Sequence, residues 1–466
     1  MSNSEHVISF FRKKANLIWP IVLIASVLRL YGLTNESLWI DELVSAVIAD
    51  PKNTLGFITE FCFREDGNPP LYYLILNLWF NLFGYSDFNA RLLSALFGIL
   101  GVFSVYSLGR KAYTINVGLI CALLSSINFF LIYYAQEVRV YSMLFLFTCV
   151  LSSLLIDIYR FARFKNYFLY GLCSLIIVYS HYYGFFVLIA HFVWILVQWQ
   201  LKKIDRKVLF EFWGTLIIIG VFYLPWVLAV IRLSTIDDYF TYTPRITFIF
   251  DYIYKYWGKN PVALIIMIFS IFVFFRRAAK KSYDLLFGLL FFIPLLLPFI
   301  RSVIVTPILE IRYTIVVLPA LLMIISRGLN AINKKRLKTV LMLVWVLASI
   351  LNISFVKKYY LNIEKTQWRE LAYEVSNFHG FNGEIIYVSK AQRNILHSYY
   401  LKKINTEINV LTYEDIDFEG VTDSEAFWTL GPIPSDMKYL KDHFNLIKVI
   451  EVKGIGAKLF TRAKKL

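Results

Sequence analysis

The chain has 466 residues, of which 58% are hydrophobic, 18% aromatic and 17% charged, and its mean hydropathy is +0.60. Soluble domains carry about a quarter charged residues, so this chain has too little polar surface to fold as several water-soluble globules. The net charge of +16 lies mostly in the first 356 residues, because residues 357–466 hold 16 basic and 14 acidic side chains. We therefore predict a multi-pass membrane protein whose basic residues anchor cytoplasmic loops, with no nucleic acid partner.

Eleven apolar segments are long enough to span a bilayer, which takes about 17–25 residues. They are 17–33, 88–108, 115–134, 138–158, 167–181, 183–199, 208–231, 260–275, 283–300, 313–328 and 338–356. Arg12, Lys13 and Lys14 precede the first, which we interpret as a retained signal anchor. Another apolar stretch, 69–84, is short and interrupted by two asparagines, so it is predicted to be an interfacial or re-entrant helix.

The distribution of basic residues sets the predicted topology. If 69–84 does not cross the membrane, 21 basic residues of the membrane part fall on the same side as Arg12. The positive-inside rule makes that side cytoplasmic, which places the N-terminus inside, the C-terminus outside and most acidic residues at the outer face. The sequence thus predicts an all-α membrane bundle over 1–356, with a first outer loop at 34–87.

The composition changes after Phe355. Short strand-like runs occur at Glu384–Val388, Glu407–Leu411, Glu425–Leu430, Leu446–Val452 and Ile455–Phe460, separated by helix-like stretches near 366–378, 391–402 and 435–443. Strands that alternate with helices indicate a small α/β domain, here 357–466, on the outer side. It contains no catalytic motif, so we expect it to cap the membrane domain or to bind a partner.

The first outer loop contains the most notable polar motif, Leu-Trp-Ile-Asp41-Glu42, directly after the first span. Two adjacent carboxylates in different surroundings can act as a base and as a metal ligand or electrostatic partner. The alternative is an acidic pair that is favoured only by the dipole of a helix N-terminus.

Other motifs follow at outer helix ends, each with an ordinary structural alternative. Asn68-Pro-Pro-Leu-Tyr72-Tyr opens the interfacial helix, where Pro is a common first residue. Gln-Glu137-Val-Arg139-Val-Tyr begins the fourth span, where the charged pair could cap the helix or Arg139 could bind a phosphate. A lone histidine such as His181 is more often a packed residue than a ligand.

Two more motifs, His181-Tyr182 and Arg312-Tyr313, follow on the same predicted membrane face. Taken together and in this order, the motifs resemble those of a known enzyme family. The resemblance is to the bacterial branch of the GT-C glycosyltransferases, the protein O-mannosyltransferase and aminoarabinose transferase group (glycosyltransferase family 39-like). It covers residues 10–330, and loosely the Trp368-Arg369 stretch. One departure is that relatives carry His or Lys, often beside an acid, just before Pro-Pro, where this chain has Gly67 and Asn68.

The resemblance implies a GT-C fold and transfer of a sugar from a polyprenyl-phosphate carrier at the outer face of a bacterial inner membrane. Asp41 maps onto the base that activates the acceptor, with Glu42 as its catalytic companion. The acceptor is a lipid, a glycan or a protein, and membrane lipids surround the bundle. The residues expected to bind substrate are Arg64, Asn68, Tyr72, Glu137, Arg139, His181, Tyr182, Arg312 and Tyr313. Whether a divalent metal ion takes part is left open; Asp66 and His181 are its candidate ligands.

Two other functions compete with this one. A lipid or solute transporter would also place charges in a helical bundle, but its coupling groups would lie near the bilayer midplane, where this sequence has no acidic residue. Transfer of a whole oligosaccharide to asparagine ranks last, because the C-terminal part lacks a Trp-Trp-Asp motif.

Overall fold

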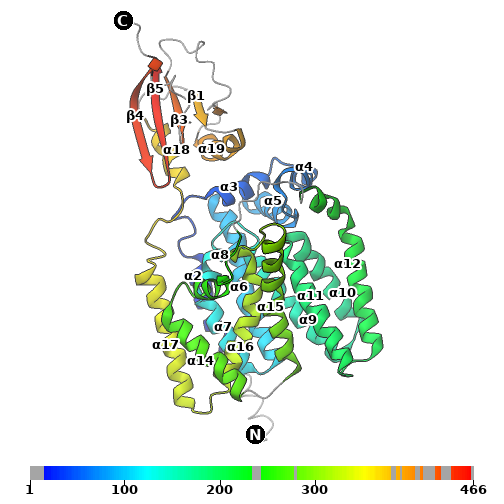
Figure 1. Cartoon of the computed structure of the whole chain (residues 1–466). Helices are drawn as coiled ribbons and strands as arrows, with labels where there is room; N and C mark the ends of the chain where they lie inside the picture. Colours follow the sequence, from blue (N-terminus) through cyan, green and yellow to red (C-terminus); the bar gives the residue numbers. More distant parts are fainter. Residues whose placement is uncertain are drawn as a thin grey trace.

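A computed structural model describes residues 15–233, 243–277, 281–378, 385–388, 391–404, 410–412, 426–431 and 442–462. Long helices form a bundle, and a small sheet with two helices lies beyond one end of it (Figure 1). The predicted all-α membrane bundle with a C-terminal α/β domain is therefore confirmed.

Every predicted span contains a helix. The helices are α2 (Ile18–Leu30), α6 (Asp87–Ala112), α7 (Ile115–Ser126), α8 (Phe129–Ala135), α9 (Tyr141–Phe161), α10 (Phe164–Ser180), α11 (Tyr183–Gln200), α12 (Arg206–Leu233), α14 (Pro261–Arg277), α15 (Ser282–Ile304), the 3-10 helix η2 (Ile311–Val317) with α16 (Leu318–Asn330), and α17 (Lys335–Leu351) with the π-helix η3 (Asn352–Val356). Among the described residues, seven helices are long and apolar enough to cross a membrane, or nine if each of two bent pairs is one span. The chain is thus a multi-pass membrane protein, and the total of eleven spans stays a prediction.

The predicted span 115–134 is not one straight helix. Helices α7 and α8 meet at 62°, because Asn128 begins a new helix by accepting the N–H of Leu131 at 2.9 Å. The buried Arg29 of α2 donates to the carbonyls of Ser125 and Ser126 at 3.1 Å or less, which satisfies acceptors that the helix end leaves without partners. The other bent pair joins α13 (Phe248–Tyr256) to α14 at 110°.

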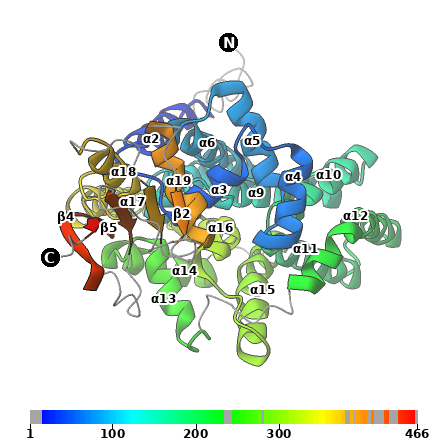
Figure 2. The same cartoon turned by 90° about the horizontal axis from the view of Figure 1, so that it is seen from above.

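The first outer loop folds into α3 (Ile40–Ile48), α4 (Leu55–Phe61), the π-helix η1 (Cys62–Asp66) and α5 (Leu71–Phe83). Helices α3, α4 and α5 lie across the end of the bundle that faces the C-terminal domain (Figures 1 and 2). Helix α5 corresponds to the stretch predicted to be interfacial, and its 13 residues are short for a span.

The C-terminal domain contains α18 (Trp368–Ser376), β1 (Ile385–Val388), α19 (Ala391–Ile404), β2 (Val410–Thr412), β3 (Ala426–Leu430), β4 (Phe444–Val452) and β5 (Ile455–Arg462). The strand order is β2-β1-β3-β5-β4, with β2, β1 and β3 parallel and the β4–β5 hairpin antiparallel. Most of the predicted helix near 435–443 lies outside the described residues. Helix α19 rests on the membrane domain through the hydroxyl of Tyr400, which donates to Asp87 at 2.7 Å and accepts the N–H of Leu38.

Reporter fusions would test the topology. We expect fusions after Lys111 and Lys203 to report the cytoplasm and a fusion after Asp66 to report the outside, because α5 does not cross the membrane in this topology. The measurement is the ratio of an alkaline phosphatase signal to a cytoplasmic reporter signal at each position. If Asp66 and Lys111 report the same side, the interfacial assignment of α5 is wrong.

Candidate active site

Asp41 lies in the first turn of α3 and contacts two arginines. Its Oδ2 accepts a hydrogen bond from Nη1 of Arg312 at 2.5 Å and lies 3.9 Å from Nη2 of Arg139. Arg139 comes from the loop before α9, and Arg312 from η2, 271 residues along the chain from Asp41. Three residues predicted from separate motifs therefore meet at one point, and the Asp41 side chain is still 24% exposed.

The two arginines differ in how fully their donors are used. Nη1 of Arg139 lies 3.1 Å from the hydroxyl of Ser45 and 3.4 Å from that of Tyr73. Nε of Arg312 is buried and has no hydrogen-bond partner among the described residues. Arg312 thus retains a donor for a further acceptor next to the Asp41 carboxylate.

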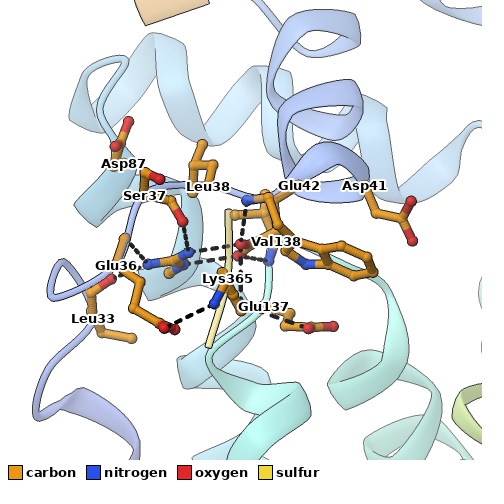
Figure 3. A network of polar contacts seen from close by, with 12 residues as sticks. Leu33, Glu36, Ser37, Leu38, Asp41, Glu42, Asp87, Glu137, Val138 and Lys365 are labelled. Carbon is orange, nitrogen blue, oxygen red and sulfur yellow. Dashed lines mark hydrogen bonds and ion pairs between the residues drawn. The ribbon is translucent and has the colours of Figure 1, made fainter. Parts of the chain in front are cut away.

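The neighbouring Glu42 points the other way, into the protein, and its side chain has no exposed surface (Figure 3). Arg91 of α6 donates to both carboxylate oxygens, from Nε to Oε1 at 2.8 Å and from Nη2 to Oε2 at 2.7 Å. Its other donors reach the carbonyls of three loop residues, Leu33, Glu36 and Ser37. Arg91 therefore ties the first outer loop to the start of α6.

Glu42 also accepts hydrogen bonds from two backbone groups. The N–H of Trp39 lies 3.2 Å from Oε2, which caps the start of α3, and the N–H of Val138 lies 3.0 Å from Oε1. Burial alone would raise the pKa of Glu42, but the charges of Arg91 and Lys365 outweigh burial and lower the pKa. Glu42 is therefore an ionised group that fixes the loop carrying Arg139 against the helix carrying Asp41.

Glu137 is a second buried carboxylate beside this network, 1% exposed. Nζ of Lys365 lies 3.6 Å from its Oε1 and 3.1 Å from Oε2 of Glu42. Neither carboxylate oxygen of Glu137 has a hydrogen-bond partner within the described part of the chain. Burial raises the pKa of Glu137, the Lys365 charge opposes the rise, and the charges of Glu42 and Asp41 add to it.

A small cavity lies next to Arg139. Its lining residues are Asn68, Pro69, Tyr72, Tyr73, Arg139, Val140, Tyr141, Ser180, His181 and Tyr313. The space is about 20 Å³, which is room for a single water molecule. Nδ1 of His181 accepts the N–H of Tyr183 at 3.1 Å, so the proton of a neutral ring is on Nε2. The predicted residues Asn68, Tyr72, Arg139, His181 and Tyr313 thus share one cavity.

Two predicted residues, Arg64 and Tyr182, make other contacts. Arg64 is exposed and paired with Glu60 at 2.9 Å on the surface of the loop helices, away from Asp41's ion pairs. The hydroxyl of Tyr182 donates to the carbonyl of Gly67 at 2.7 Å. Gly67 ends η1 with φ of +77°, a left-handed conformation that favours glycine.

Within the described residues, the proposed metal ligands Asp66 and His181 do not belong to a cluster of acidic, histidine or cysteine side chains. Asp66 accepts hydrogen bonds from Asn68 and from the hydroxyl of Tyr73, both at 2.9 Å. Across the described ranges, no group of three or more His, Cys, Asp or Glu side chains could hold a metal ion. Asp66 and His181 therefore do not supply the ligand set of a divalent ion.

Two residues of the network, Arg91 and Lys365, were not predicted from the sequence. Arg91 stands four residues into an apolar span, and a charged group at the edge of a membrane helix was a usable signal. Lys365 is 323 residues from Glu42 and carried no signal of its own.

Comparisons with solved structures establish the class of fold. ArnT from Cupriavidus metallidurans in the apo state matches with a TM-score of 0.62 and 12% identity, over 95% of this chain and 97% of that chain. The same protein bound to undecaprenyl phosphate matches with a TM-score of 0.58, 12% identity and the same coverage. The apo oligosaccharyltransferase of Archaeoglobus fulgidus matches with a TM-score of 0.55 and 11% identity, over 85% of this chain and 64% of that one. The fold is that of the GT-C glycosyltransferases, as predicted.

A family model adds sequence evidence within this fold. The model described as dolichyl-phosphate-mannose-protein mannosyltransferase matches residues 67–227, which include Arg91, Glu137, Arg139 and His181. A search of curated protein sequences found no match. The family match and the shared fold together support a membrane glycosyltransferase of the GT-C superfamily.

Proposed function

We propose that this protein transfers a sugar from a polyprenyl-phosphate donor to a hydroxyl acceptor at the outer face of the cell membrane. The observation that carries the proposal is the contact of one carboxylate, Asp41, with two arginines, of which Arg139 lines a small cavity. ArnT from Cupriavidus metallidurans, of which 97% is covered, was solved with undecaprenyl phosphate bound, and this supports a polyprenyl-phosphate donor. The sugar is a hexose or a pentose, and the acceptor is a lipid, a glycan or a protein.

The arginines suit the phosphate of such a donor. Guanidinium groups bind phosphate through paired N–H donors, and Arg312 has a buried Nε without a partner among the described residues. The cavity of about 20 Å³ is too small for a sugar phosphate in this conformation. We infer that the donor phosphate replaces the Asp41 carboxylate as the partner of Arg312, which separates the pair and opens the site.

This exchange couples donor binding to catalysis. Once Asp41 is released from Arg312, its carboxylate can accept the proton of the acceptor hydroxyl, while that oxygen forms the new bond to the anomeric carbon. The bond between the anomeric carbon and the phosphate oxygen breaks in the same reaction. The leaving polyprenyl phosphate gains a second negative charge, which Arg139 and Arg312 stabilise.

Glu42 and Glu137 have different parts in this proposal. Glu42 is fully buried and gripped by Arg91, so it positions Asp41 and does not contact substrate. Glu137 is 1% exposed and its carboxylate lies beside Lys365, so it does not contact substrate either. The base is therefore Asp41 alone.

The test of the enzyme proposal is transfer by purified protein. The protein is incubated with a radiolabelled polyprenyl-phosphate sugar and with membrane lipid, glycan and protein fractions as acceptors. We expect label to leave the polyprenyl carrier and to appear on one acceptor class. If sealed vesicles instead move the intact donor across the bilayer without transfer, the transporter alternative is correct.

Replacing Arg139 or Arg312 by Lys is expected to weaken donor binding about tenfold. Lysine keeps the charge but loses the paired donors, and one hydrogen bond to a charged group is worth about 1.5–3 kcal/mol. The measurement is the Kd for polyprenyl phosphate in detergent. Arg64→Lys serves as the matched control, because Arg64 is exposed and paired with Glu60. Unchanged affinity in both variants would show that the two arginines only anchor the helices.

A further inference from the structure

The segment that joins the membrane domain to the C-terminal domain, residues 357–367, lies against the first outer loop. Oε1 of Glu36 accepts the N–H of Lys365 at 3.0 Å, and the hydroxyl of Ser37 donates to the carbonyl of Thr366 at 2.8 Å. The same hydroxyl accepts the N–H of Trp368 at 2.9 Å. These contacts fix the backbone on both sides of Lys365.

The other side of this segment is attached to the C-terminal sheet. The N–H of Gln367 donates to the carbonyl of Lys453, in the turn between β4 and β5, at 3.0 Å. Nζ of Lys453 in turn donates to the carbonyl of Ile363. The position of Lys365 therefore depends on the C-terminal domain as well as on the first loop.

The charges of the buried network balance only when Lys365 is present. Glu42 and Glu137 contribute two carboxylates, and Arg91 and Lys365 contribute two cations, all with side chains at most 8% exposed. Arg91 pairs with Glu42. Among the described ion pairs, the cation within 4 Å of Glu137 is Lys365. Without Lys365, two buried carboxylates would share one cation, an arrangement that favours uptake of a proton.

We propose that Lys365 is a positioning residue for the reaction proposed above: its ammonium group holds Glu42 and Glu137 together and thereby sets the spacing of Asp41 and Arg139. Glu42 is adjacent to Asp41 in α3, and Glu137 is two residues before Arg139. Through Lys365, the C-terminal domain supports the active site. This inference rests on the proposed function for its meaning, but the ion-pair geometry stands independently.

The test combines variants of Lys365 and Glu137 in the full-length protein. We expect Lys365→Met to lower kcat for sugar transfer about tenfold or more, and Lys365→Arg to retain most of it, since Arg supplies the same charge. Adding Glu137→Gln to Lys365→Met removes the unpaired carboxylate and is expected to recover a large part of the lost kcat. If the Lys365 side chain only filled space, removing the charge of Glu137 would not compensate for its loss.

Lys358→Met is the matched control, because Lys358 belongs to the same segment and is exposed. Thermal unfolding in detergent is measured for every variant, and the Tm of the Lys365→Met variant is expected to rise when Glu137→Gln is added. Wild-type kcat in Lys365→Met, strictly additive Tm changes, or Lys365→Arg as impaired as Lys365→Met would each overturn the proposal. A wild-type protein that transfers no sugar contradicts the proposed function instead, and the Tm cycle then still decides whether Lys365 holds Glu137.

Discussion

Asp41→Asn is expected to reduce sugar transfer by about 10²–10⁴-fold, the usual effect of removing a general base. Asparagine preserves the size of the side chain and a hydrogen bond to Arg312, so the fold should be unchanged. It cannot accept the proton of the acceptor hydroxyl. The measurement is the single-turnover rate with a radiolabelled polyprenyl-phosphate sugar.

We do not expect Asp41→Asn to weaken binding of the donor. In the wild type, the Asp41 carboxylate occupies Arg312 and has to be displaced by the donor phosphate. Asp41→Asn removes that competing charge, so the Kd for polyprenyl phosphate should stay equal or decrease while transfer is lost. Asp50→Asn, just beyond the C-terminal end of α3, is the control and should affect neither quantity. A normal transfer rate in Asp41→Asn would mean that another group is the base.

The sequence brings out the polar residues of the candidate site, and the structure shows how they are arranged. Arg139 and Arg312 stand at the outer ends of predicted spans and Asp41 in the first outer loop, and the predicted topology places all three on one face. Their direct contact required the three-dimensional packing of α3, α9 and η2. The roles of neighbours in one helix also depend on where that helix starts, because successive residues differ in direction by about 100°. This is why the side chains of Asp41 and Glu42 point in different directions (Figure 3), so that Asp41 pairs with Arg139 and Arg312 while Glu42 is buried.

Two features depend on side chains that are distant in the sequence. The bend between α7 and α8 falls at Ser125, Ser126 and Asn128 inside a predicted span, and Arg29 of another helix satisfies the carbonyls that the bend exposes. Lys365 belongs to a segment without periodicity, and its role follows from a contact across more than 300 residues. In both cases a charged side chain that is distant in the sequence stabilises the local structure. A hydrophobic pattern does not indicate which distant side chain will be the partner.

Glu42→Gln is expected to destabilise the protein strongly, with a loss of about 3–5 kcal/mol, as is typical when one member of a buried ion pair is removed. Arg91 and Lys365 would remain buried with one carboxylate, Glu137, for two cations. The measurement is thermal unfolding in detergent, with Asp251→Asn as the control, because Asp251 and Lys255 form an exposed pair that should contribute less than about 1 kcal/mol.

The pKa of Glu42 is lowered in the folded state, so the stability that it contributes is present above its unfolded pKa of about 4.3 and is lost as the pH falls. The difference in Tm between wild type and Glu42→Gln should therefore be full at pH 7 and shrink below pH of about 4. If Glu42→Gln instead has a wild-type Tm and no transfer activity, Glu42 takes part directly in the chemistry and its assignment as a positioning residue is wrong.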